Sequence, residues 1–109
     1  MPRRKASNEL RARIFNALSD PDRLRILEAL IEKVKEGKAG DIVRASKVSR
    51  EDVLPHLGEL RKAQLVAVRR IGPYNYYRVV DAKAVDRILE AVDNYLVLLE
   101  ELRRKGMAI

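Results

Sequence analysis

The stretch "AGDIVRASKVSREDVLPHLGELRKA", residues 39–63, decides the fold, because it contains two short helical patterns joined by a tight turn. The first pattern has three apolar residues, Ile42, Val43 and Ala45. The turn "KVS" ends at Ser49, a residue type that caps helices, and this predicts a helix from there to about Ala63. Its inward-facing stripe is formed by Val53, Leu57 and Leu60. Two helices joined in this way form a helix-turn-helix.

Two further helices are predicted upstream of this motif. Apolar residues at helical spacing indicate a first helix over residues 9–18. In the second, Asp20 provides the cap, Pro21 suits the first helical position, and Gly37 is expected to end the helix. The expected buried stripe of this second helix is Leu24, Leu27, Ile31 and Val34.

A β-hairpin is predicted downstream of the motif. The segments "LVAVRRI" (65–71) and "YYRVV" (76–80) are rich in β-forming residues, and the "GPYN" between them signals a turn. Successive strand residues point to opposite faces, so either Tyr76 or Tyr77 is expected to lie in the core. A hairpin that directly follows a helix-turn-helix is a wing.

The last predicted helix, residues 82–105, has an apolar heptad seam. Its members are spaced alternately three and four residues apart: Val85, Ile88, Val92, Tyr95, Leu99 and Leu102. The seam continues about two turns beyond what a small domain covers, which favours a dimer through this helix and through Leu10 and Ile14 of the first helix. The alternative is a long helix that lies on its own domain.

The charge of the chain is unevenly placed. The formal net charge is +7 over 109 residues, and residues 38–80 carry nine basic against four acidic residues. Residues 1–13 carry five basic against one acidic residue. This excess favours a polyanion as partner, whereas the alternative is an ordinary basic surface that maintains solubility. The charged fraction of 36% is common in thermophile proteins.

Several classes of protein are excluded by what the composition lacks. There is no cysteine, which excludes disulfides and thiolate chemistry. No apolar run approaches the roughly 20 residues that span a bilayer, and the basic start is not followed by an apolar segment, so a cytoplasmic location is expected. His56 is the single histidine, and a structural role is expected for it. No Gly-rich phosphate loop is present, so we do not expect an enzyme.

Three segments together resemble the ArsR/SmtB family of winged-helix repressors. They are "ALSDPDRLRILEAL" (17–30), "VSREDVLPHLGELRKAQLV" (48–66) and "RRIGPYNYYRV" (69–79). The resemblance implies a homodimeric transcription regulator whose first and last helices pack across a two-fold axis. The expected fold is mainly α with a β-hairpin (α+β), a winged helix-turn-helix with a long C-terminal dimerisation helix. The expected organisation is a single domain, 1–109, with a basic arm (1–8), a winged-helix body (9–80) and the dimerisation helix (81–109).

The chain departs from the metal-sensing members of this family. The family's best-known sensor site places two cysteines in the third helix, and the aligned positions here are Lys38 and Gly40. Another sensor type uses histidines of the last helix, but residues 81–109 contain none. Three acids on one face of that helix, Asp86, Glu90 and Asp93, are interpreted as a solvated surface. We therefore expect no metal ion and no cofactor.

The helix expected to read DNA carries unusual residues. Arg50 is a candidate for a guanine contact, whereas Glu51 and Asp52 suit the positive end of the helix dipole but repel phosphates. Pro55 cannot donate a backbone hydrogen bond, and one way to accommodate it is a regular helix that starts late, with Asp52 as its cap instead of Ser49. Tyr74 and Asn75 are either groove contacts or simple turn residues. The residues expected to contact DNA are Lys47, Ser49, Arg50, Leu54, Gly58, Arg61, Lys62, Arg69, Arg70, Tyr74, Asn75 and Arg78.

These observations predict a metal-independent, dimeric DNA-binding regulator. It would contact duplex DNA through the 49–63 helix and the 65–80 wing, with binding dominated by backbone electrostatics. Two alternatives remain: a winged helix used as a protein-interaction module through Leu54, Pro55 and the long helix, and a non-specific architectural DNA-binding protein.

Overall fold

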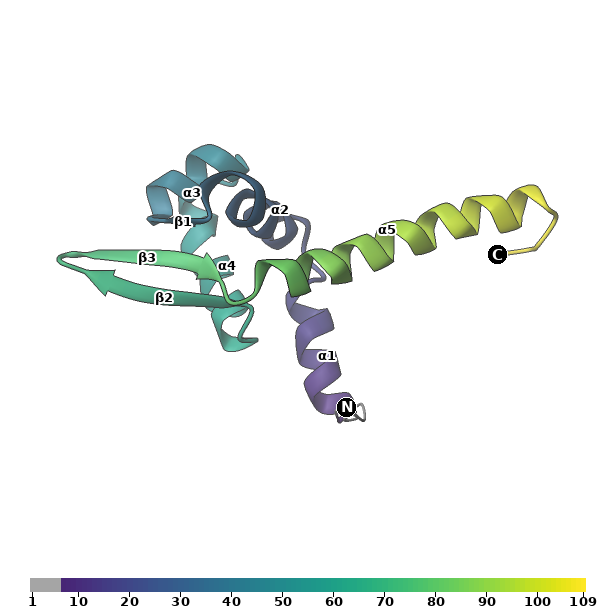
Figure 1. Cartoon of the computed structure of the whole chain (residues 1–109), viewed down its shortest axis with the longest axis horizontal. Coiled ribbons are helices and arrows are strands. Elements are labelled where there is room, and N and C mark those ends of the chain that lie inside the picture. Colours follow the sequence, from purple (N-terminus) through teal and green to yellow (C-terminus); the bar gives the residue numbers. More distant parts are fainter. Residues whose placement is uncertain (1–6) are drawn as a thin grey trace.

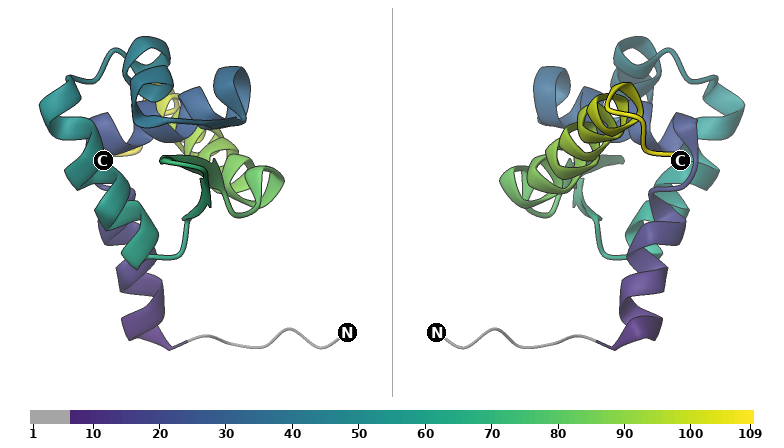
Figure 2. Two further views of the ribbon diagram at one scale, coloured as in Figure 1. Left: turned by 90° about the vertical axis from the view of Figure 1, so that its left-hand side faces the viewer. Right: turned by 90° about the vertical axis from the view of Figure 1, so that its right-hand side faces the viewer.

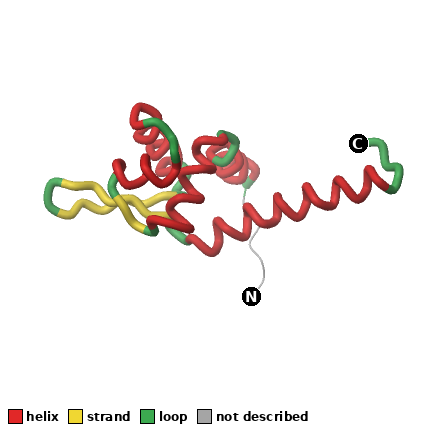
Figure 3. The backbone as a smooth tube through the Cα atoms, turned by 90° about the horizontal axis from the view of Figure 1, so that it is seen from above, coloured by secondary structure: helices red, strands yellow, loops and turns green. Residues whose placement is uncertain are grey.

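The computed structural model describes residues 7–109, so most of the predicted basic arm, residues 1–6, lies outside the described residues. The elements follow in the order α1 (Asn8–Ala17), α2 (Pro21–Ala29), η1 (Leu30–Val34), β1 (Glu36–Gly37), α3 (Ala39–Ser46), α4 (Arg50–Lys62), β2 (Val66–Ile71), β3 (Tyr74–Val79) and α5 (Ala82–Arg104). The hairpin of β2 and β3 and the helix α5 extend in opposite directions from the helical body (Figures 1 and 3). The expected mainly helical fold with a hairpin wing is confirmed.

Side-chain caps fix the starts of α1, α2, α4 and α5. The hydroxyl of Ser7 accepts from the backbone N–H of Leu10 at 3.2 Å, and the carboxylate of Asp81 accepts from that of Ala84 at 3.1 Å. Asp20 caps α2, and Pro21 takes the first helical position, as the sequence predicts. Lys47, in the left-handed conformation at φ 65°, ends α3 and begins the turn to α4.

The second helix ends differently from the prediction. The α-helix stops at Ala29 and continues as one π-helical turn, η1, in which the N–H of Lys35 donates to the carbonyl of Leu30 at 3.0 Å. Lys35 then turns the chain with φ 62°, so Gly37 does not end the helix. Gly37 lies instead in β1, where a Cβ atom would collide with the side chain of Val34. A two-residue strand is too short to show alternation, so the sequence did not reveal it.

The strands form one antiparallel sheet in the order β1-β3-β2. The register pairs Val66 with Val79 and Ile71 with Tyr74, which leaves Gly72 and Pro73 as a two-residue turn. Gly72 has φ 59°, as in hairpin turns that have glycine at the first central position. Tyr77 is buried and Tyr76 half-buried, which confirms that one of the two tyrosines belongs to the core.

The core lies where α2, α3 and α4 meet the sheet. Its fully buried side chains are Ile26, Leu27, Leu30, Ile42, Val53, Leu57 and Leu60. Seen from its two ends, the molecule shows α4 on one side of the hairpin and α5 on the other (Figure 2). Only the start of α5 is packed into the body, through Val85, and the helix then projects outwards (Figure 1). Within residues 7–109, no helix is both long and apolar enough to cross a membrane.

Candidate nucleic-acid interface

The N-terminus of α4 is held by a reciprocal cap. The hydroxyl of Ser49 accepts from the backbone N–H of Asp52 at 3.3 Å and donates to the carboxylate of Asp52 at 2.9 Å. Because Ser49 is the cap, the helix begins at Arg50, and the expected late start with Asp52 as cap is wrong. Pro55 therefore lies inside the helix, where it cannot donate to the carbonyl of Glu51.

Arg50 lies beside α3. Its Nη2 atom is 3.9 Å from the place that a Cβ atom on Gly40 would occupy, and Nη1 of Arg44 is 3.7 Å from the same place. Two guanidinium groups therefore lie close to Gly40 at the N-terminal end of α3. Arg44 also donates to the carboxylate of Asp41 on the same helix.

A cleft of about 390 Å³ separates α3 from α4 and the tip of the wing. Lys38 and Arg44 contribute cationic groups to it, and Leu54, Tyr74 and Asn75 line the other side. The ammonium of Lys38 stands 4.5 Å from the ring centroid of Tyr74, a cation–π distance that links the start of α3 to the wing. Leu54 and Tyr74 remain 55% and 52% exposed, although both are large and apolar or aromatic.

The two neighbouring arginines of the wing have different surroundings. Arg69 donates from Nε and Nη2 to one carboxylate oxygen of Glu36 at 3.0 and 2.6 Å, so it fastens β2 to β1. Arg70 is the next residue of β2 and pairs with Asn75 across the hairpin. Because successive strand residues point to opposite faces, Arg70 lies on the other face of the sheet from Arg69. Among residues 7–109, neither Arg70 nor Arg78 forms an ion pair.

The other residues expected to contact DNA lie at the surface. Exposed residues in this group are Lys47, Ser49, Arg61 and Lys62. Lys62 donates to Glu59 at 3.2 Å, which offsets part of its charge. Gly58 is half-buried, and no atom lies within 4 Å of the place where its Cβ would be, so the α4 surface is open there.

A second surface lies between α1 and α5 and is almost entirely apolar. It forms a groove of about 570 Å³, lined by Arg11, Ile14, Phe15, Ile88, Ala91, Val92, Tyr95 and Leu96. The side chains of Leu10 and Val92 are 51% and 52% exposed, whereas those of Leu99 and Leu102 are less exposed. Val85, expected at a dimer interface, is buried in the core of the protomer itself. Phe15 also belongs to this surface and is 64% exposed. It was not predicted there, although it follows Ile14 on an amphipathic helix.

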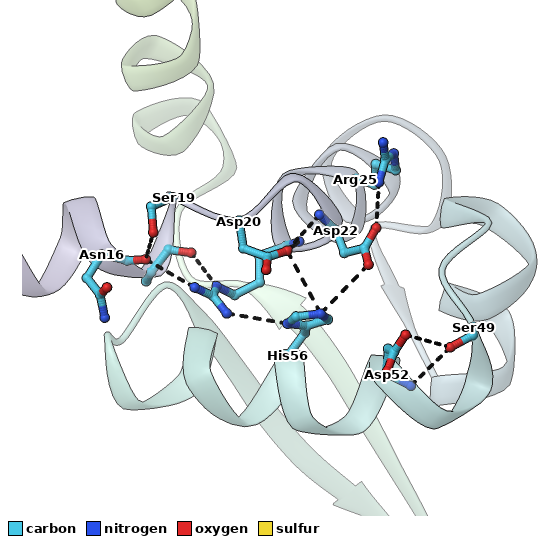
Figure 4. A network of polar contacts seen from close by, with 10 residues as sticks. Asn16, Ser19, Asp20, Asp22, Arg25, Ser49, Asp52 and His56 are labelled. Carbon is cyan, nitrogen blue, oxygen red and sulfur yellow. Dashed lines mark hydrogen bonds and ion pairs between the residues drawn. The ribbon is translucent and has the colours of Figure 1, made fainter.

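The guanidinium of Arg23 joins three helices. Its neighbours Asn16, Asp20 and His56 are labelled in Figure 4. Arg23, on α2, donates from Nε to the carbonyl of Ala17 at 2.7 Å and from Nη2 to the carbonyl of Asn16 at 3.1 Å. Both carbonyls belong to the last turn of α1. The Nη1 atom of Arg23 lies 3.4 Å from Nδ1 of His56 on α4. The sequence does not indicate this junction, because Arg23 and His56 are 33 residues apart.

His56 faces two carboxylates on its other side. Its Nε2 atom is 3.9 Å from an oxygen of Asp20 and 3.9 Å from an oxygen of Asp22 (Figure 4). Desolvation tends to raise the pKa of Asp20, but the backbone N–H groups of Arg23 and Asp22 donate to its carboxylate. Together with the nearby charge of Arg23, these bonds hold the pKa of Asp20 below its ordinary value.

The cluster of Asp20, Asp22 and His56 has the spacing of a metal site, since one donor atom from each lies within 4.8 Å of the others. The contact with Arg23 differs from the usual surroundings of a metal-bound histidine. Arginine has only donors, so Nδ1 of His56 must accept in this contact and Nε2 then carries the proton. A metal-bound histidine normally donates its second N–H to an acceptor, the reverse of this arrangement.

Comparisons with known proteins agree with this architecture. The family model described as "Bacterial regulatory protein, arsR family" matches residues 20–68. A transcriptional repressor SmtB homologue of Synechocystis is 37% identical over 83 residues, which cover 76% of this chain but only 61% of that protein. An uncharacterised HTH-type transcriptional regulator of Methanocaldococcus jannaschii is 36% identical over 85 residues, covering 78% of this chain and 93% of the relative.

Solved structures show the same fold. A homodimeric winged helix-turn-helix DNA-binding domain from Mycobacterium bovis, described as a possible ArsR-family regulator, has a TM-score of 0.67 and 26% identity, and the match covers 98% of this chain and all of that one. NolR from Sinorhizobium fredii has a TM-score of 0.68 and 27% identity, with 85% and 96% of the two chains covered. Both the sequence relatives and the fold are those of transcriptional regulators and not of enzymes. This chain belongs to the ArsR family of winged helix-turn-helix transcriptional regulators.

Proposed function

We propose that the protein regulates transcription as a metal-independent homodimer that binds duplex DNA through α4 and the wing. The observation that carries this proposal is the cleft between α3, α4 and the wing tip, where Lys38 and Arg44 stand beside exposed Leu54 and Tyr74. Cationic groups at the rim suit phosphates, and exposed apolar groups suit base methyls or sugars. A regulator bound to the chromosome would act in the cytoplasm, the location that the sequence predicts.

Backbone electrostatics dominate the proposed contact. The exposed cations on α4 and the wing that form no ion pair within the described chain are Arg50, Arg61, Arg70 and Arg78. By contrast, Glu51 and Asp52 at the start of α4 repel phosphates, and Gly58 has no side chain with which to contact a base. We therefore assign phosphate contacts to the basic residues and only modest sequence selectivity to α4.

The homodimer is proposed to form through the groove between α1 and α5. The groove is apolar and large, and the Mycobacterium bovis neighbour is described as homodimeric. A second copy would cover the side chains of Phe15, Val92 and Tyr95, which a monomer leaves more than half exposed.

A duplex titration tests the proposal. Binding of random-sequence DNA is measured by fluorescence anisotropy at about 50 and about 200 mM salt, and the affinity should fall steeply because phosphate contacts release counterions. A sequence-selective regulator should also prefer its own upstream DNA over random duplex. The absence of duplex binding at low salt would overturn the proposal in favour of a protein-interaction module built on Leu54 and Pro55. Equal affinity for every duplex would indicate an architectural protein.

Metal independence is tested separately. The expected result is that zinc added to chelator-treated protein leaves the DNA affinity unchanged, because Arg23 keeps the His56 lone pair away from the two carboxylates. A stoichiometric zinc titration that changes the affinity would contradict this and would indicate the Asp20, Asp22 and His56 cluster as its site.

A further inference from the structure

The junction at Arg23 connects the surface proposed for dimerisation to the helix proposed for DNA binding. Its guanidinium holds the last turn of α1 by two hydrogen bonds to backbone carbonyls, and the same group contacts His56 in the middle of α4. The side chain of His56 is only 18% exposed, so the contact is sheltered from water. A displacement of α1 is therefore transmitted to α4 through one rigid, planar group.

The position of α4 relative to α1 matters because DNA binding by a dimer depends on it. Two recognition helices related by a two-fold axis enter successive major grooves only when their separation matches about one turn of DNA. In the proposed dimer, α1 belongs to the interface and α4 to the DNA. The contact between Arg23 and His56 connects α1 to α4. Because the roles of both helices are those of the proposed dimer, this inference rests on the proposed function.

The surroundings of His56 determine which of its nitrogen atoms carries the proton. Arg23 donates to Nδ1, and Nε2–H points to Asp20 and Asp22. The last turn of α1 contributes only backbone carbonyls to this junction. On α4 itself, the acids one turn away on either side are engaged elsewhere, Asp52 with Ser49 and Glu59 with Lys62.

We infer that His56 is a positioning residue for DNA binding: it sets α4 relative to α1 by accepting a hydrogen bond from Arg23, and it does so only as a neutral imidazole. A second proton on His56 would occupy Nδ1 and place an N–H donor against the N–H of Arg23, 3.4 Å away. The contact would then be lost, while Nε2–H would stay directed at Asp20 and Asp22. DNA affinity falls as the imidazole takes up this proton.

Three substitutions of His56 distinguish the contact that its imidazole makes with Arg23 from the contact that it makes with the two carboxylates. His56→Asn places an amide oxygen near the position of Nδ1 and keeps an acceptor for Arg23. His56→Gln places its amide near the position of Nε2 and keeps a donor for the carboxylates only. His56→Leu removes both contacts, and none of the three variants titrates. Duplex affinity, dimer dissociation and thermal unfolding are measured for each full-length variant.

At pH 7.5 the expected loss of DNA affinity is about tenfold for His56→Leu and for His56→Gln, because each lacks the acceptor for a charged donor. His56→Asn should recover most of that loss. As the pH is lowered, wild-type affinity should fall relative to His56→Asn, because only the wild type can lose the acceptor at Nδ1 by protonation.

The inference would be overturned if His56→Asn bound DNA as weakly as His56→Leu, or if wild type and His56→Asn had the same pH profile. If His56→Leu does not fold, the comparison of these two pH profiles still decides the matter. A wild-type protein that binds no duplex at low salt would overturn the proposed function and this inference with it. Duplex binding that is unaffected by all three substitutions would overturn the inference alone.

Discussion

At the scale of single residues, the start of α4 combines a well-formed cap with a costly proline. Ser49 and Asp52 satisfy each other, so the acid at Asp52 has a structural purpose. Pro55 has no comparable benefit within the protomer, because its side chain is exposed and its nitrogen cannot donate to Glu51. A residue that destabilises its helix at an exposed position on the proposed DNA surface is more easily explained by contact with a partner than by folding.

Replacing Pro55 with alanine should stabilise the protein. A proline inside a helix costs about 3 kcal/mol relative to alanine, of which we expect about 1–3 kcal/mol to be recovered in the free energy of unfolding. Chemical denaturation measures it. Pro21→Ala is the matched control, because Pro21 occupies the first helical position, and no gain is expected there. Equal effects of the two substitutions would contradict this account of Pro55.

The two acids at the start of α4 should respond differently to neutralisation. Glu51→Gln should strengthen binding to any duplex by removing repulsion, with little change in stability, since Glu51 is exposed and does not take part in the Ser49 cap. Asp52→Asn should remove the same repulsion but weaken the cap, and lower the free energy of unfolding by about 0.5–1 kcal/mol. Affinity and denaturation measured together distinguish these effects. Weaker DNA binding by a folded Glu51→Gln variant would show that Glu51 contacts DNA favourably.

At the scale of elements, the wing is a hairpin with one arginine committed to structure and another available to a partner. Arg69 is bound to Glu36, and this ion pair anchors the hairpin to β1. It also neutralises the carboxylate of Glu36. Arg70 lies one residue further on and faces the other side of the sheet. In the proposed complex with DNA, β1 would therefore determine which arginine of the pair is available to phosphates.

Substitution of each arginine tests this difference. Arg70→Ala should weaken binding to every duplex about equally and make the log–log salt slope shallower by about one unit, as expected for one lost phosphate contact. Arg69→Ala should change the slope less and should mainly loosen the attachment of β2 to β1. The slopes are read from titrations at several salt concentrations. Equal changes for both variants would mean that Glu36 releases Arg69 on binding DNA.

At the scale of the whole molecule, the shape separates two surfaces. The extents are 57 × 35 × 21 Å, with the wing at one end and the free part of α5 at the other (Figure 1). Cations lie around the cleft at the wing, and exposed apolar side chains lie along α1 and α5. In a monomer the apolar face would remain in contact with water, which is unfavourable. Exposed apolar surfaces of this kind are typical of protein–protein interfaces.

Leu99→Asp should release monomers, because a second copy would bury the added charge against an apolar seam. Val97→Asp is the matched control: Val97 is 60% exposed and, by helical geometry, faces away from Val92 among charged residues. Sedimentation at micromolar concentration should show a monomer for the first variant and a dimer for the second. A wild-type protein that sediments as a monomer would remove the proposed interface, as would dissociation caused equally by both substitutions.

The sequence by itself determined the local structure of this protein. The caps at Asp20 and Ser49, the start of α2 at Pro21 and the hairpin turn at Gly72 were all predicted, because each depends on residues no more than a few positions apart. The heptad spacing in α5 likewise predicted an apolar face that the single protomer leaves largely open. The sequence also indicated the family, through three motifs in order.

Only the tertiary structure decided which side chains from distant segments meet. Arg69 is paired with Glu36, and His56 lies between Arg23 and two carboxylates, at separations of 33 to 36 residues. No periodicity or cap relates such residues, since their proximity results from the packing of α2 against α4 and of β1 against β3. The sequence predicts a phosphate contact for Arg69 and a structural role for His56, but it cannot indicate the partners Glu36 and Arg23, because only the packing of distant segments brings these groups together.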